Sequence, residues 1–123
     1  MIINLNLKSD IPIFEQIVNQ IIFAIYHGEL KSGTPLPPVR TLAESLGINF
    51  MTVNKAYQVL KEMGYIKTYG RAGTKVCDKE ESDLETKEEI DKLKQILARL
   101  KLMGMTDGEL EKEIYSFLAE AAI

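Results

Sequence analysis

Apolar positions recur every three or four residues in three separate blocks along the first half of the chain. The blocks cover residues 14–25, residues 38–46 and residues 49–63, and each would place its apolar side chains on one face of a helix. Pro12 suits the first turn of the first helix, and Gly28 is a suitable residue to end it. The pattern therefore predicts three amphipathic helices before residue 64.

The join between the second and third helices is short. Gly47 is placed to close one helix, and Asn49 is a good N-cap for the next. Two helices joined by so short a turn with a glycine at the corner are typical of a helix-turn-helix. Residues 65–69 and 74–77 are then rich in β-forming side chains and flank a glycine-containing tip at residues 70–73. The order of helix, helix, helix and hairpin predicts a winged helix-turn-helix.

The last third of the chain returns to helical spacing. After a polar stretch at residues 77–83, one apolar stripe runs over residues 90–103, and a second follows Thr106 and Glu109, which form a capping-box pair. These stripes could fold back on the winged helix of the same chain, or two chains could combine them in a four-helix contact. We expect the second arrangement, and the candidate dimerisation residues are Ile90, Leu93, Leu97, Leu100, Ile114, Phe117 and Leu118.

The expected fold is mostly α with a small β-hairpin. We expect a winged helix-turn-helix DNA-binding domain at residues 1–76, a linker at residues 77–83 and a two-helix dimerisation tail at residues 84–123. Charge divides the chain at the same place. Residues 1–76 carry eight Lys and Arg against five Asp and Glu, whereas residues 77–123 carry seven against thirteen. The net charge is therefore +3 for residues 1–76 and −6 for residues 77–123, which suggests that the two segments have different functions. Only the first segment has a charge that suits a polyanionic partner.

Composition narrows the setting of the protein. The 123 residues contain no apolar run of about 18, so no membrane-spanning segment is expected. Residues 1–7 lack the basic start and long apolar stretch of a secretory signal. A single cysteine, Cys77, fits a reducing compartment, so we expect a cytoplasmic protein.

Catalytic chemistry has almost no support in the sequence. His27 has no Cys or His partner nearby and is expected to be a surface or cap histidine rather than a metal ligand. Nothing near Cys77 favours a thiolate. Phosphate-cradling loops, nucleophile motifs and metal-ligand clusters do not occur, so we expect no enzyme, no metal and no cofactor. We expect Phe50 to be a packed turn residue and Tyr57 to belong to the core.

The front of the third helix carries groups that suit DNA base edges. Asn54 can pair with adenine, and Thr52 or Met51 can touch a thymine methyl. Lys55 can contact a phosphate or a guanine. The alternative for Thr52 and Asn54 is an ordinary solvent-facing helix position.

A second group of candidates lies in the helix before the turn and in the hairpin. Arg40 suits a phosphate or groove-edge contact, and Arg71 at the glycine-rich tip suits a narrow minor groove. Arg40 has the alternative of an ion pair within the domain, and Arg71 that of a mobile turn charge. The candidate DNA-contacting residues are Arg40, Asn49, Met51, Thr52, Asn54, Lys55, Arg71, Gly73 and Lys75.

Five stretches of the sequence together resemble the GntR family of bacterial transcription regulators. They are PIFEQI at residues 12–17, GELKSG at residues 28–33, LPPVRTLA at residues 36–43, TVNKAY at residues 52–57 and GTKV at residues 73–76. The short remainder is similar to the YtrA subfamily, whose helical tail mediates dimerisation. The resemblance implies a regulator that represses its own operon, often together with genes for ABC transporters.

The sequence departs from the family pattern at several positions. Pro38 stands where the family usually has Ser, and Phe50 where many relatives have Arg or Pro. Gly70 and Arg71 reverse the usual Arg-Gly order at the hairpin tip, and Lys75 replaces an apolar residue. We therefore expect an operator preference that differs from the usual inverted repeat of the family.

The sequence as a whole predicts a homodimeric repressor that binds double-stranded DNA at a palindromic operator. One alternative is a winged-helix protein-interaction module that does not read DNA. Another is a repressor that responds to an unknown small-molecule effector bound between tail and winged helix.

Overall fold

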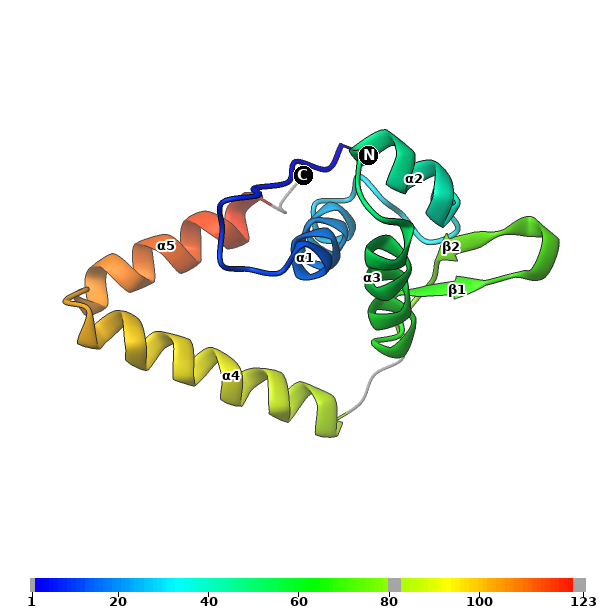
Figure 1. The fold of residues 1–123 in the computed structure, drawn as a ribbon. Coiled ribbons are helices and arrows are strands. Elements are labelled where there is room, and N and C mark those ends of the chain that lie inside the picture. Colours follow the sequence, from blue (N-terminus) through cyan, green and yellow to red (C-terminus); the bar gives the residue numbers. More distant parts are fainter. Residues whose placement is uncertain (1, 80–82, 121–123) are drawn as a thin grey trace. The chain divides into compact units, whose positions relative to one another are not determined.

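The computed structural model describes residues 2–79 and 83–120 of the chain. It divides into two compact units, residues 1–79 and residues 80–123, which we call the head and the tail. The head contains helices α1, α2 and α3, a 3₁₀ turn η1 and strands β1 and β2 (Figure 1). Their bounds are Ile13–Tyr26 for α1, Val39–Leu46 for α2, Phe50–Glu62 for α3, Ile66–Thr68 for β1, Gly70–Ala72 for η1 and Thr74–Val76 for β2. The predicted winged helix-turn-helix is confirmed.

Helix α3 forms the centre of the head and packs against both α1 and α2. Its inward face consists of residues that are almost fully buried, namely Val53, Ala56, Tyr57 and Leu60. Ile17 and Ile21 of α1 are equally buried and belong to the same core. This packing fixes the rotation of α3, so that its opposite face is directed to solvent.

The corner between α2 and α3 follows the residues that predicted it. Gly47 caps α2 in a left-handed conformation with φ of 68°, which a side chain would strain. Asn49 caps α3, and its side-chain Oδ1 accepts a hydrogen bond from the Met51 backbone N–H at 2.8 Å. This cap satisfies a donor in the first turn of α3, the turn that begins the exposed face.

The hairpin, which we call the wing, is shorter than the sequence indicated. The register pairs Ile66 with Val76, Lys67 with Lys75 and Thr68 with Thr74. The predicted strand ends at Tyr65, Tyr69 and Cys77 lie outside the ladder. At the tip, η1 follows Tyr69 directly. At the other end, the Tyr65 N–H bonds to the Leu60 carbonyl oxygen in the turn after α3, and a single bond from the Cys77 N–H to the Tyr65 carbonyl oxygen continues beyond the strands. Backbone bonds from residues 33–36 to the outer edge of β2 anchor the wing to the head, which a two-stranded hairpin needs for stability.

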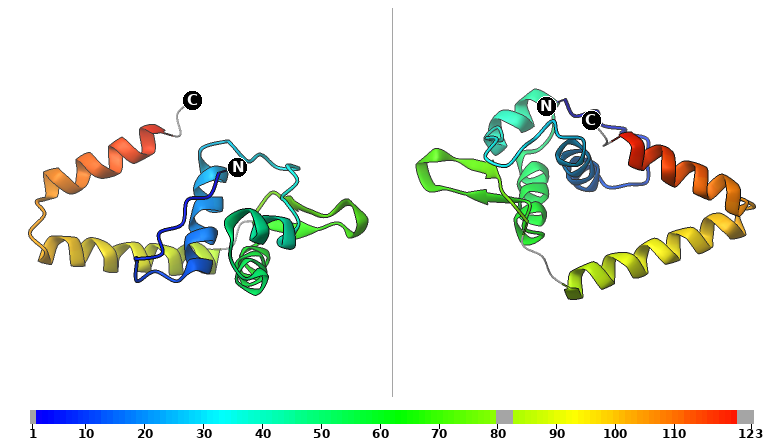
Figure 2. Two further views of the ribbon diagram at one scale, coloured as in Figure 1. Left: turned by 45° about the horizontal axis from the view of Figure 1, so that its top comes forward. Right: turned by 180° about the vertical axis from the view of Figure 1, so that it is seen from behind.

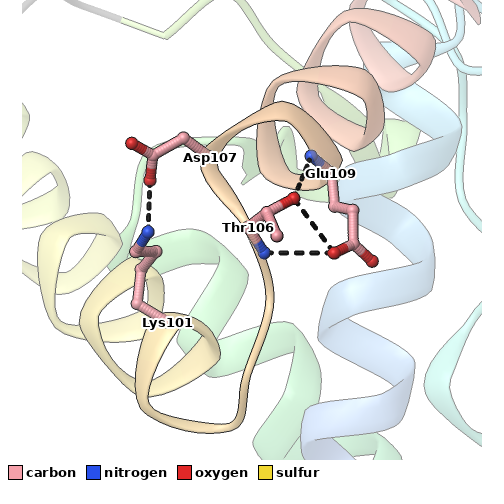
Figure 3. Close-up of polar contacts among 4 residues, drawn as sticks. All are labelled: Lys101, Thr106, Asp107 and Glu109. Carbon is pink, nitrogen blue, oxygen red and sulfur yellow. Dashed lines mark hydrogen bonds and ion pairs between the residues drawn. The ribbon is translucent and has the colours of Figure 1, made fainter.

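The tail consists of α4, Asp83–Leu102, and α5, Asp107–Glu120. Helix α4 thus begins at the last residue of the predicted linker. The predicted capping box is present: Thr106 Oγ1 accepts from the Glu109 backbone N–H at 3.2 Å, and Glu109 Oε1 accepts from the Thr106 N–H at 3.2 Å (Figure 3). Lys101 and Asp107 form an ion pair across the same corner. The two helices meet at this corner and diverge from it in every view (Figure 2).

Among the described residues, no helix combines the length and the apolar character that crossing a membrane requires.

Candidate nucleic-acid interface

The first two turns of α3 present most of the predicted base-contacting residues to solvent. Met51 is 66% exposed, Asn54 and Lys55 are exposed, and Thr52 is half-buried. Together with residues 13–14 of α1, these four side chains line an open groove of about 620 Å³. The structure therefore brings the four candidates together on one surface. Asn49 lies beside them as the helix cap, with its side chain engaged by the backbone.

Lys55 lies against an aromatic ring at this groove. Its Nζ is 4.1 Å from the ring centroid of Phe14, a residue of α1 that also packs on the core. At that separation the ring attracts the ammonium group and restricts its position. The sequence analysis missed this role for Phe14, because the contact joins residues of two different helices.

Arg40 makes a similar contact on the other side of the corner. Its Cζ is 5.0 Å from the ring centroid of Phe50, the first residue of α3. Phe50 is 45% exposed, so the expectation that it is a packed turn residue is wrong. The alternative of an ion pair for Arg40 within the domain is not found: within residues 2–79 no carboxylate lies at ion-pair distance from it.

Tyr57 ties the core to the start of α2. The ring is 1% exposed, as expected for a core residue, and its hydroxyl donates a hydrogen bond to the Pro37 carbonyl oxygen at 2.7 Å. Pro38, the N-cap of α2, offers no side-chain cap, so the Tyr57 bond holds the segment that leads into α2 and Arg40. Burial raises the pKa of the Tyr57 phenol from 10.0 to about 12.

This raised pKa predicts a specific loss of stability at high pH. The folded state favours the neutral phenol. Its contribution to the free energy of unfolding is therefore complete below about pH 10 and is lost as the pH rises toward 12. The shift sets an upper limit of about 3 kcal/mol on the free energy of unfolding that is lost over this range. Urea unfolding of the protein and of Tyr57→Phe at pH 8 to 12 should show the wild type ahead by about 1 kcal/mol at pH 8. That advantage should vanish or reverse by pH 12. Parallel pH profiles for the two proteins would contradict the role of the phenol.

The wing carries a second set of cations. Arg71 lies in η1 and is exposed, and Gly73 follows it with φ of 81°, a conformation that suits glycine. Lys75 is directly opposite Lys67 in the ladder, and both Nζ atoms lie near the Tyr69 ring, at 5.8 and 5.9 Å from its centroid. Lys67 was missed in the sequence analysis, although the hairpin register would have paired it with Lys75.

The cations of α3 and of the wing are not neutralised by ion pairs within the described head. Like charges directly opposite in a ladder destabilise it, and no carboxylate of the described head is within ion-pair distance of Lys67, Lys75, Lys55 or Arg71. Such groups are ready to exchange counterions for phosphates. The arrangement suits a polyanion that meets both the front of α3 and the wing.

His27 and Cys77, the remaining candidates for reactive chemistry in the head, make ordinary packing and hydrogen-bond contacts. His27 is the C-cap of α1, in line with its expected cap role, and its ring packs near Phe23 and Tyr26. The Cys77 thiol donates a weak hydrogen bond to the Gly64 carbonyl oxygen, with Sγ at 3.4 Å. Across the described residues, no group of three or more potential metal-ligating side chains is gathered in one place.

Comparison with known proteins agrees with this geometry. The model of the family "Bacterial regulatory proteins, gntR family" matches residues 13–76. The transcriptional repressor YtrA of Bacillus subtilis is 35% identical over 113 residues, which are 89% of this chain and 85% of YtrA.

Two solved structures extend the likeness beyond the head. YtrA from Sulfolobus acidocaldarius, a GntR-family transcription factor, is 37% identical with a TM-score of 0.60, covering 98% of this chain and all of that one. A transcriptional antiterminator from Listeria monocytogenes EGD-e is 31% identical with a TM-score of 0.90, covering 98% and 93% of the two chains. The chain therefore belongs to the GntR family of DNA-binding transcription regulators, which are not enzymes, and among them to the YtrA-like members with a short helical C-terminal tail.

Proposed function

We propose that this regulator is a cytoplasmic repressor that binds a palindromic operator as a homodimer. The observation that carries the proposal is the exposed polar front of α3, flanked by cations that have no carboxylate partner in the described head. YtrA of Bacillus subtilis is a repressor and is similar over most of this chain, which supports repression rather than activation. The YtrA resemblance points to its own operon, with genes for an ABC transporter, as the target.

The proposed contacts divide by chemistry. Thr52 and Asn54 face base edges in the major groove, with Met51 beside a thymine methyl. Arg40, Lys55 and Lys75 bind the sugar–phosphate backbone, to which we add Lys67 because of its place opposite Lys75. Arg71 enters the minor groove, and Gly73 allows close approach of the backbone at the tip. Asn49 acts through its cap on α3.

The tail supplies the proposed dimer contact. Most residues of the predicted stripe are exposed in the single chain, and Leu97 and Leu100 are half-buried. Helices α4 and α5 diverge from their corner (Figure 2), and most apolar residues of the predicted stripe remain exposed on their faces. A second tail would bury these faces in a symmetric contact. Such a dimer would set two copies of α3 about 34 Å apart, one turn of DNA, or a multiple of that distance. When bound to the operator, the dimer would repress transcription by excluding RNA polymerase from the DNA.

Salt dependence of binding to the DNA upstream of the protein's own gene tests the function. Tight binding that prefers this DNA over scrambled DNA and weakens steeply with salt is expected. Lys75→Ala should weaken binding to both DNAs alike and lower the salt slope by about 0.9 for each half-site. Lys8→Ala is the matched control, since Lys8 is exposed at the start of the head and has no proposed contact. Weak, salt-insensitive binding that is equal on both DNAs would favour the protein-interaction alternative.

A further inference from the structure

An aromatic ring and a guanidinium group face each other across the helix-turn-helix corner. Arg40 is the second residue of α2, and Phe50 is the first residue of α3. The Arg40 Cζ lies 5.0 Å from the centroid of the Phe50 ring, within the range of a cation–π contact. Asn49 caps α3 immediately before Phe50 and so fixes the backbone from which the ring projects.

This ring is the one aromatic contact that the described head offers to Arg40. Arg40 is exposed, and no carboxylate of residues 2–79 lies close enough to pair with it. An exposed arginine loses rotamer freedom when it binds a phosphate, and that loss opposes binding. A ring that already restricts the side chain reduces the loss, and a planar guanidinium suits stacking on it.

Phe50 itself is poorly explained by packing. Its side chain is 45% exposed, and it is not among the residues that pack on the core of the head. An exposed phenylalanine at the first position of a helix gains little from burial. The contact with Arg40 is therefore the main interaction of the Phe50 ring at the corner between α2 and α3.

We propose that Phe50 is a positioning residue that holds the Arg40 guanidinium in place for DNA. The inference rests on the proposed function, in which Arg40 binds the sugar–phosphate backbone. Phe50 acts through Arg40 and makes no required contact of its own with a base. The same design is present at the groove, where Phe14 holds Lys55 at 4.1 Å and serves as an independent comparison.

Two substitutions of Phe50 distinguish the effect of its aromatic face from that of its apolar volume. Phe50→Tyr keeps an aromatic face for Arg40, whereas Phe50→Leu keeps apolar bulk without one. Operator affinity should stay within about twofold for Phe50→Tyr and fall about three- to tenfold for Phe50→Leu. The salt slope of Phe50→Leu should stay unchanged, because Arg40 still reaches its phosphate, whereas Arg40→Gln should lower it by about 0.9 per half-site.

The decisive measurement is a double-mutant cycle. In an Arg40→Gln background, Phe50→Leu should cause no further loss of affinity, since there is no guanidinium left to position. Phe14→Leu should weaken operator binding by the same factor in the Arg40→Gln background as in the native background, because Phe14 contacts Lys55 instead. Thermal unfolding of each variant checks that the exposed substitution leaves the head folded.

Two results would overturn the inference. An equal loss from Phe50→Leu with and without Arg40 would mean that Phe50 contacts DNA directly. Full affinity for Phe50→Leu in the native background would mean that the ring does not matter. Failure of the proposed function is distinguishable, since the unmodified protein would then show no preference for its operator.

Discussion

Leu93→Glu should turn the proposed dimer into a monomer without unfolding either unit. Leu93 lies on the predicted stripe of α4 and is 49% exposed in the single chain, so a carboxylate there remains hydrated in the monomer. In a symmetric dimer the substitution occurs twice at one apolar contact, and each buried, unpaired charge costs several kcal/mol. A loss of at least about 4 kcal/mol, roughly a thousandfold in the dimer dissociation constant, is expected. Sedimentation equilibrium measures it.

The matched control lies on the same helix. Gln95→Glu adds the same carboxylate on the opposite side of α4, where the neighbouring positions are charged, and should leave the dimer intact. Circular dichroism should show unchanged helix content for both variants. A Leu93→Glu protein that still sediments as a dimer would exclude the α4 stripe as the contact.

Loss of the dimer should also weaken operator binding steeply. Two heads on one dimer bind a palindrome as a linked pair, whereas a monomer binds each half-site alone. Removing the tail after about residue 83 should have the same effect. The head alone should then retain base preference at a single half-site, because α3 and the wing both belong to it.

Most of the fold could be predicted because its signals are local. The period of apolar residues defines α1, α2 and α3, Gly47 and Asn49 mark the corner, and Thr106 with Glu109 marks the start of α5. The ends of strands β1 and β2 could be predicted less accurately. Tyr65 and Tyr69 favour strands by composition, but Tyr65 bonds back to Leu60 in the turn after α3 and Tyr69 is followed directly by η1.

For the candidate interface, the exposed face of α3 could be predicted from the sequence, but the neighbours of its side chains could not. The exposed face of α3 follows from its buried face, which gives Met51, Thr52, Asn54 and Lys55 directly. The rings beside Arg40 and Lys55 do not follow, because each of these two contacts joins residues of different helices at a distance that only the packed head defines. Phe50 shows this most clearly: composition favours burial, and the corner geometry leaves its ring exposed beside Arg40.

Asn54→Ala should remove preference for one base at a single position of each half-site. Asn54 is exposed on the front of α3, one turn from the Asn49 cap, and its amide can make two hydrogen bonds with adenine. Loss of such a pair is worth about 1–3 kcal/mol, which is about 5- to 150-fold in affinity at that position. Alanine is a better helix former than asparagine, so stability should be unchanged or slightly raised.

Affinity measured on a set of operators, each with one base pair changed, tests this role. Asn54→Ala should bind the native operator more weakly but lose nothing further when its own base pair is changed. Gln58→Ala is the matched control, since it removes another exposed amide one turn further along α3, away from the front of the helix. If Asn54→Ala weakened all operators and scrambled DNA by the same factor, Asn54 would be a backbone contact instead. Base readout would then fall to Thr52 and Met51, which share its groove.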